Sequence, residues 1–177
     1  MSELASDPIA KKNPAISERA DVAVTHLAAR RGMREALASA ALAAFGVDIP
    51  STPRAVETGS VMIVWAGPDQ WLIIEPQRAG VDASVQHAKT FNGLASVLDV
   101  SDSRTIFRVK ASHPSDVLVR NMGIDFEDSS FKPGDVAITH VSHLGVMTWR
   151  LPDGSGYEFA CARTYSRDFL SWLNKIV

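Results

Sequence analysis

Apolar residues recur along the chain at two spacings, which predict helices alternating with short strands. In REALASAALAAFG the apolar residues fall near one helical face, and Gly46 can close this helix in the left-handed conformation. The predicted packing face consists of Leu37, Ala40, Ala41 and Ala44.

The segment SVMIVWA alternates in side-chain direction while both of its faces are apolar, which indicates a central strand. QWLIIE follows after Gly67, Pro68 and Asp69, so the two segments are predicted to form a hairpin. Further strands are predicted at SVLDVS, TIFRVK, DVAITHV, GVMTWRL and GYEFACA.

Three other segments have helical spacing. In VDASVQHAKTF the residues Val81, Val85, Ala88 and Phe91 are predicted to form the packing face. In ASHPSDVLVRNMG, Ser112 can cap a short helix that ends at Gly123. In TYSRDFLSWLNKI, Thr164 can cap a final helix whose apolar stripe consists of Tyr165, Phe169, Trp172, Leu173 and Ile176.

These elements predict an α+β fold with antiparallel sheets and flanking helices. Residues 1–24 are expected to be a flexible polar leader. No low-complexity linker divides the rest, so residues 25–177 are predicted to form a single compact domain with two closely packed halves, about 25–95 and 96–177.

Composition narrows the functional classes. The chain has 177 residues, of which 46% are hydrophobic and 21% are charged, as in ordinary globular proteins that bury a sizeable core. Its formal net charge of −2 supplies no electrostatic footprint for nucleic acid or for an anionic membrane, so neither is an expected partner.

The single cysteine, Cys161, excludes an internal disulfide and a cysteine-rich metal site, and it is expected to be a small buried residue on a strand. The N-terminal segment lacks the apolar run of a secretion signal, and later segments fall short of the roughly 20 apolar residues of a membrane span. The sequence therefore favours a cytoplasmic protein.

Motifs for phosphate cradles, nucleophile elbows and zinc helices are absent from the sequence. His140 and His143 suggest a metal site, but residues three apart on a strand point to opposite faces, so this interpretation is disfavoured. His26, His87 and His113 stand singly, and His87 is predicted to lie on the surface side of its helix.

The stretch LDVSDSRTIFRV crowds polar residues between two strands. A catalytic cluster would need a histidine beside Ser101 or Ser103 together with an oxyanion hole. Asp and Ser between strands more often bond the backbone donors of a tight turn, so a structural turn is favoured. Arg104 or Arg108 could neutralise a partly buried aspartate there.

The same stretch begins a resemblance to a known family. LDVSDSRTIFRVKASHPSDVLVRNMGIDF, FKPGDVAITHVSHLGVMTWRLPDG and FLSWL, together with the earlier WAGPDQWLII, resemble the gamma subunit of heterotetrameric sarcosine oxidase. The resemblance covers roughly residues 25–177. That subunit is similar to the folate-binding domain of the glycine-cleavage aminomethyltransferase, which implies the same fold here.

The resemblance also implies a function and partners. The complex oxidatively demethylates sarcosine to glycine and hydrogen peroxide and yields methylenetetrahydrofolate. Alpha, beta and delta subunits are the implied partners, and FAD, FMN, NAD, zinc and tetrahydrofolate are attributed to them. This chain is therefore expected to be a non-catalytic assembly subunit that binds no cofactor alone.

One residue is implied as a remnant of a folate site. Asp125 in GIDF matches the aspartate that faces folate in the aminomethyltransferase, and Lys132, Pro133 and Gly134 match its KPG turn. The sequence departs from that enzyme at VSHLGVMTWR, where a glycine hairpin and two acidic residues are replaced by a shorter segment. We therefore expect the scaffold without the active site. The alternative is a freestanding folate-binding protein or folate-dependent one-carbon transferase that uses Asp125.

Overall fold

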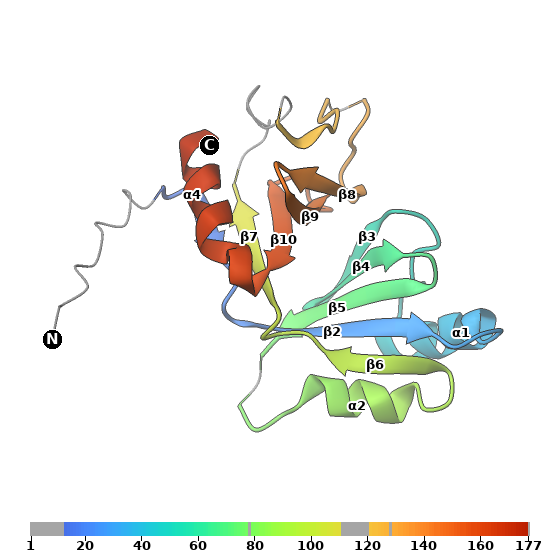
Figure 1. Cartoon of the computed structure of the whole chain (residues 1–177). Helices are drawn as coiled ribbons and strands as arrows, with labels where there is room; N and C mark the ends of the chain where they lie inside the picture. The colour runs from blue at the N-terminus through green and yellow to red at the C-terminus, as the bar shows by residue number, and fades with distance from the viewer. Residues whose placement is uncertain (1–12, 78, 111–120, 128, 177) are drawn as a thin grey trace, which may run out of the picture.

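The computed structural model describes residues 13–77, 79–110, 121–127 and 129–176 (Figure 1). The strands form two five-stranded antiparallel sheets, and helices lie on their outer faces. The helices are α1 (Arg34–Phe45), α2 (Ala83–Thr90), the short 3-10 helix η1 (Arg163–Tyr165) and α4 (Ser166–Ile176). Within the described residues, no helix is long and apolar enough to cross a membrane.

The first sheet, here called the N-terminal sheet, is built around β2 and β5. Its strands, in spatial order, are β3 (Ala55–Thr58), β4 (Val61–Gly67), β5 (Gln70–Pro76), β2 (Val22–Ala29) and β6 (Ala95–Asp99). The predicted β4–β5 hairpin is confirmed, with Trp65 paired to Trp71 and with Asp69 in the left-handed region of the turn.

The second sheet, here called the C-terminal sheet, contains the strands of the second half together with one strand from the beginning of the described chain. Its strands, in spatial order, are β1 (Ile16–Glu18), β7 (Arg104–Val109), β10 (Tyr157–Ala162), β9 (Leu144–Arg150) and β8 (Val136–Val141).

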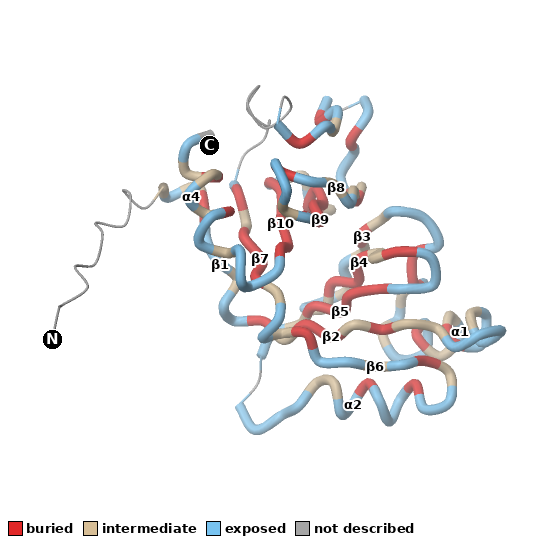
Figure 2. Tube along the Cα trace, in the orientation of Figure 1, coloured by how far each residue is buried: buried red, intermediate tan, exposed pale blue. Residues whose placement is uncertain are grey.

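Three clusters of buried side chains divide the core among these layers (Figure 2). Val24, Leu72 and Trp149 belong to the cluster between the two sheets. A second cluster lies between the N-terminal sheet and α1, where Leu37 is fully buried. The third lies between the C-terminal sheet and α4, where Phe169 is fully buried. Each sheet thus buries both of its faces.

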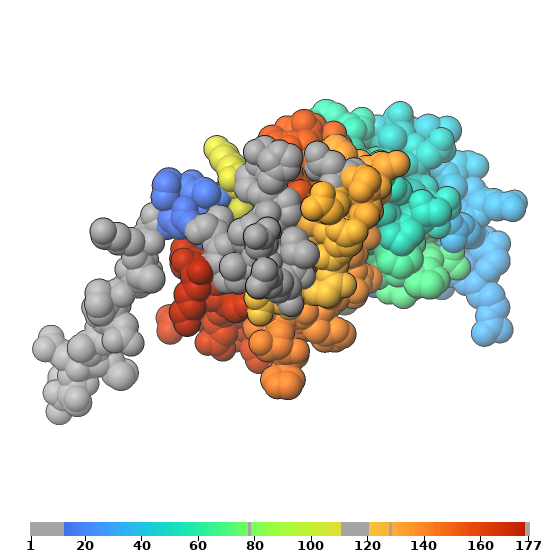
Figure 3. Space-filling view, turned by 90° about the horizontal axis from the view of Figure 1, so that it is seen from above, coloured from blue at the N-terminus to red at the C-terminus, as the bar shows by residue number. Residues whose placement is uncertain are grey.

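The KPG turn joins the two sheets at one edge (Figure 3, orange beside teal). Gly134 accepts a hydrogen bond from the Ala55 backbone N–H at 2.7 Å, and the Arg54 guanidinium pairs with Asp135 and donates to the Pro133 carbonyl. A Cβ on Gly134 would lie 3.1 Å from the Ala55 carbonyl oxygen, and φ is positive at 84°. Glycine is therefore strongly favoured at this junction.

Several predicted elements are confirmed. α1 ends at Gly46, which has φ of 73° and donates its N–H to the Leu42 carbonyl. Its predicted face is confirmed for Leu37 and Ala41, which are fully buried, whereas Ala44 is exposed. Cys161 is buried on β10, as expected.

Other predictions are corrected. The predicted polar leader reaches residue 24, yet Ile16–Glu18 and the first residues of β2 already belong to the two sheets. β6 was assigned to the second half of the chain, but it pairs with β2 in the N-terminal sheet, where Ala95 joins the buried cluster next to the helices. The 3-10 turn η1 precedes α4, and Thr164 lies inside η1, so Thr164 does not cap the last helix. The helix predicted over 112–123 lies mostly outside the described residues.

The prediction of which side chains face the core is least accurate for helix α2. Val81 and Val85, predicted to face the core, are 42% and 47% exposed, while His87, predicted on the surface, is 7% exposed. Phe91 is buried as predicted. The helix is rotated because His87 finds polar partners on the sheet beneath it, which apolar periodicity cannot reveal.

Candidate functional site

The polar stretch after β6 forms a tight turn that satisfies its own backbone. The Ser101 hydroxyl donates to Asp99 Oδ1 at 2.6 Å and accepts from the Val24 N–H at 2.9 Å. The Ser101 N–H also donates to Asp99 Oδ1, at 2.9 Å. The structural interpretation is confirmed, because these side chains bond backbone donors at the crossing from one sheet to the other.

Arg163, which follows β10, holds the same turn from outside. Its Nε donates to the Asp102 carbonyl at 2.9 Å, and its Nη2 donates to the carbonyls of Ser101 and Arg104 at 3.1 and 2.9 Å. A guanidinium is suited to this task because its donors form a rigid fork. The turn is thus fastened to the C-terminal sheet by a residue that sequence reasoning did not single out.

The charged residue that Arg108 neutralises is Glu158 and not an aspartate of the turn. Glu158 on β10 is fully buried and lies opposite Arg108 in the strand register. Its Oε1 accepts from Arg108 Nε and Nη2 at 2.8 and 2.7 Å and from Arg19 Nη1 at 2.7 Å. The triad ties β7 and β10 to the link between β1 and β2. It is a structural ion pair, because no exposed surface reaches the carboxylate.

Asp125 lies on an exposed turn after Met122. Its carboxylate accepts from the Glu127 N–H at 3.1 Å. Hydrogen bonds from Ser130 and from the Glu127 N–H lower the pKa of Asp125 below its usual value. The side chain is therefore an anionic turn residue with local partners, and its role as a folate remnant stays a prediction.

The residues of the KPG turn, which match the folate-binding family, lie at the junction between the two sheets. Lys132, Pro133 and Gly134 are committed to the junction between the sheets, where Lys132 N–H donates to Asp135 Oδ2 at 2.6 Å. The backbone of this turn is therefore bonded within the chain, and a role of these residues toward folate stays a prediction.

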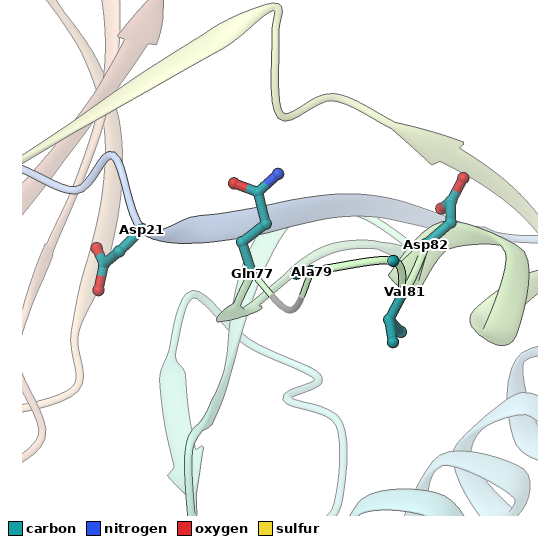
Figure 4. Close-up of a pocket in the computed structure, with 6 residues that line it drawn as sticks. Asp21, Gln77, Ala79, Val81 and Asp82 are labelled. Atoms are coloured by element: carbon teal, nitrogen blue, oxygen red, sulfur yellow. The ribbon is translucent and has the colours of Figure 1, made fainter.

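A surface depression of about 610 Å³ lies elsewhere, at the loop between β5 and α2 (Figure 4). Asp21 and Asp82 lie at opposite ends of it. The pKa of Asp82 is lowered by bonds from Ser84 and the Val85 N–H, and that of Asp21 by its own backbone N–H and by Arg19. Both carboxylates therefore serve the local fold and form no acid–base pair.

The histidines named from sequence are not brought together. His140 on β8 and His143 in the following turn are both exposed. His26 contacts Gln70 through Nε2 at 3.0 Å, and His113 lies outside the described residues. Among the described residues, no three His, Cys, Asp or Glu side chains are grouped in a way that could hold a metal ion.

His87 is the buried titratable group that the sequence analysis missed. Its Nδ1 lies 3.2 Å from the Thr25 hydroxyl, its Nε2 lies 3.2 Å from Glu75 Oε1, and the Phe45 ring meets it edge-on at 5.8 Å. Burial lowers the pKa of His87, and the Glu75 carboxylate opposes this shift in part. Thr25 is 1% exposed, so the trio offers no accessible nucleophile.

The sequence from residue 31 to residue 177 matches the sarcosine oxidase, gamma subunit family. The chain belongs to this family. The match covers the β6–β7 turn, Asp125 and the KPG turn, so the predicted resemblance is confirmed.

Individual members of the gamma subunit family are similar at moderate identity. Sarcosine oxidase subunit gamma from Corynebacterium sp. (strain P-1) is 28% identical over 138 residues, covering 76% of this chain and 66% of that protein. Sarcosine oxidase subunit gamma from Arthrobacter sp. is 24% identical over 121 residues, covering 67% of this chain and 59% of that protein. The chain thus spans less than two thirds of the length of each relative.

Solved structures establish the fold of this gamma-family chain. A heterotetrameric sarcosine oxidase from Corynebacterium sp. U-96, in complex with pyrrole 2-carboxylate, matches with a TM-score of 0.73 and 20% identity, over 89% of this chain and 80% of that chain. Glycine cleavage system aminomethyltransferase T from Bartonella henselae matches with a TM-score of 0.60 and 9% identity, over 88% and 44%. The predicted α+β, aminomethyltransferase-like fold is confirmed.

Proposed function

We propose that this chain is a non-catalytic assembly subunit of a heterotetrameric sarcosine oxidase, in which alpha, beta and delta subunits are its partners. That complex would oxidatively demethylate sarcosine to glycine, hydrogen peroxide and methylenetetrahydrofolate. Membership of the gamma subunit family is the observation that carries the proposal. The match to a heterotetrameric sarcosine oxidase supports it.

The geometry of the polar groups also supports an assembly role. Three prominent polar groups of the described residues are bonded within the fold: Glu158 Oε1 binds two arginines, Ser101 binds a β2 backbone donor, and Arg163 binds three carbonyls. An active site instead requires groups that remain available to a substrate. In this proposal FAD, FMN, NAD, zinc and tetrahydrofolate are bound by the other subunits.

Co-expression tests the proposal. The chain is produced with the three other subunits of its sarcosine oxidase, and the purified material is analysed for mass, flavin absorbance and hydrogen peroxide production from sarcosine. We expect a four-subunit, flavin-containing complex whose yield falls when this chain is omitted. Assembly of a fully active three-subunit enzyme in equal yield without this chain would contradict the proposal.

A second candidate function is favoured by the fold shared with aminomethyltransferase T. In it, the chain is a freestanding folate-binding protein or folate-dependent transferase that uses Asp125, whose carboxylate is exposed and anionic. It predicts tetrahydrofolate binding by the isolated chain and loss of that binding in Asp125→Asn, which keeps the side-chain size while removing the charge.

A further inference from the structure

Helix α2 (Ala83–Thr90) and Val81, which precedes its capping residue Asp82, present apolar side chains to solvent. Val81, Val85 and Ala88 are exposed, whereas His87 and Phe91 face the N-terminal sheet. A surface helix normally buries its apolar stripe and exposes its polar side, because this arrangement removes the most apolar area from water. α2 has the opposite orientation, and it lies at the periphery of the molecule, at the lower edge of Figure 1.

Specific contacts hold α2 in this orientation. The ring of His87 lies between the Thr25 hydroxyl and the Glu75 carboxylate, each 3.2 Å away. Rotation of the helix to bury Val85 would break both contacts of His87. The Asp82 carboxylate fixes the start of the helix, because it caps the first turn by accepting from the Val85 N–H at 3.2 Å. The outward direction of the stripe is therefore built into the fold.

The charges beside the stripe are self-complementary. Asp82 and Lys89 are exposed at opposite ends of α2 and are seven residues apart, which corresponds to about 10 Å along the helix axis. Val85 lies near the midpoint between them. An antiparallel second copy, related by a two-fold axis near Val85, places each Asp82 opposite the Lys89 of the other copy.

The same arrangement matches the apolar side chains. It places Val85 against Val85 of the other copy, and Val81 against Ala88, whose small side chain permits the helices to approach closely. We propose that the outward face of α2 (Val85, Ala88 and Lys89), together with Val81 and Asp82 just before the helix, is a docking surface for a second copy of this chain. This inference is independent of the proposed assembly function.

The size of the surface sets the strength of the contact. An eight-residue helix that presents Val85 and Ala88, with Val81 just before its cap, buries less than the roughly 1,200 Å² of a stable interface. The dimer therefore belongs to the weak, transient class, and it is sought in the full purified chain at high protein concentration and at low ionic strength, where the two ion pairs are least screened.

Sedimentation equilibrium over a range of concentrations tests the docking surface. Val85→Glu is expected to weaken self-association at least tenfold, because it places two like charges together on the two-fold axis. Leu42→Glu on α1 is the matched control, since Leu42 is 46% exposed and Val85 is 47% exposed. Equal weakening by both substitutions would overturn the assignment to α2.

Charge exchange gives an independent test that does not depend on Val85. Lys89→Glu creates repulsion at both ends of the symmetric pair, and Asp82→Asn removes the acidic partner while it keeps a capping side chain, so each variant alone is expected to associate less than the unsubstituted chain. An equimolar mixture restores one attractive pair, between Asp82 of the first variant and Lys89 of the second, and is expected to associate more than either variant alone. Monomers throughout, in the mixture and in the unsubstituted chain, would overturn the proposal while leaving co-purification with the oxidase subunits unaffected.

Discussion

Replacement of Glu158 by glutamine removes one buried charge while it keeps the shape of the side chain. In the folded chain Glu158 Oε1 accepts three hydrogen bonds from two arginines, at 2.7 to 2.8 Å. Glu158→Gln removes the carboxylate that Arg19 and Arg108 share and leaves Arg19 with the exposed Asp21 as an acidic partner, 3.3 Å away. The substitution therefore tests whether the triad stabilises the crossing between the sheets.

The expected loss follows from burial. Removal of one partner from a buried ion pair costs about 3–5 kcal/mol, because the remaining charge is left without compensation. The side chains of Arg19 and Arg108 are 21% and 31% exposed, so water can solvate part of their charge. The lower end of the range applies, and we expect the free energy of unfolding to fall by about 3 kcal/mol, more than a hundredfold in the equilibrium constant.

Urea unfolding followed by far-ultraviolet circular dichroism measures this loss from the midpoint and the slope. Glu57→Gln on β3 is the matched control: Glu57 is an exposed strand residue, so its substitution is expected to change the free energy of unfolding by less than about 0.5 kcal/mol. A Glu158→Gln protein as stable as the Glu57→Gln protein would refute the reasoning.

Three further predictions concern a glycine, a histidine and the cysteine. Gly156→Ala is expected to lower the free energy of unfolding by more than about 2 kcal/mol in urea titrations, because its Cβ would lie 2.2 Å from the Val109 carbonyl oxygen; an unchanged midpoint would contradict this. The pKa of His87 lies below its ordinary value of 6.5, so the unfolded chain binds more protons, and stability should fall as the pH drops from about 6.5 towards the folded pKa. In His87→Gln the urea midpoint should depend less on pH over this range. An equally steep pH dependence in the variant would exclude His87 as its source. Burial raises the pKa of Cys161 to about 11, so a thiol reagent at pH 8 should modify it only after unfolding; rapid reaction in the native chain would show that the residue is accessible.

Local signals in the sequence were sufficient for α1 and for the β4–β5 hairpin. Gly46 marks the end of α1, and the turn after Gly67 separates two apolar segments, so each boundary is encoded by nearby residues. β2 was missed although VAVTHLAA is rich in apolar residues. The pairing of β6 with β2 depends on residues about 70 positions apart, which no local pattern specifies.

The polar groups, too, were predictable where their partners are close in the sequence and were missed where their partners are distant. The bonds of Ser101 to Asp99 are local, and the sequence predicted them correctly as a turn. Arg163 and Glu158 bind partners that lie about 50 to 140 positions away along the chain. His87 was assigned to the surface because its partners lie on other elements, Thr25 on β2, 62 positions away, and Glu75 on β5. These contacts override the apolar periodicity of α2.

The measurement that tests the assembly role most directly is calorimetric titration of the isolated, folded chain with tetrahydrofolate, with the Asp125→Asn variant beside it. The proposed function predicts no heat of binding in either protein, since the polar groups that match the folate-binding family are bonded within the fold. Saturable binding by the unsubstituted chain that is lost in Asp125→Asn would contradict the account and would place a working folate site on this chain.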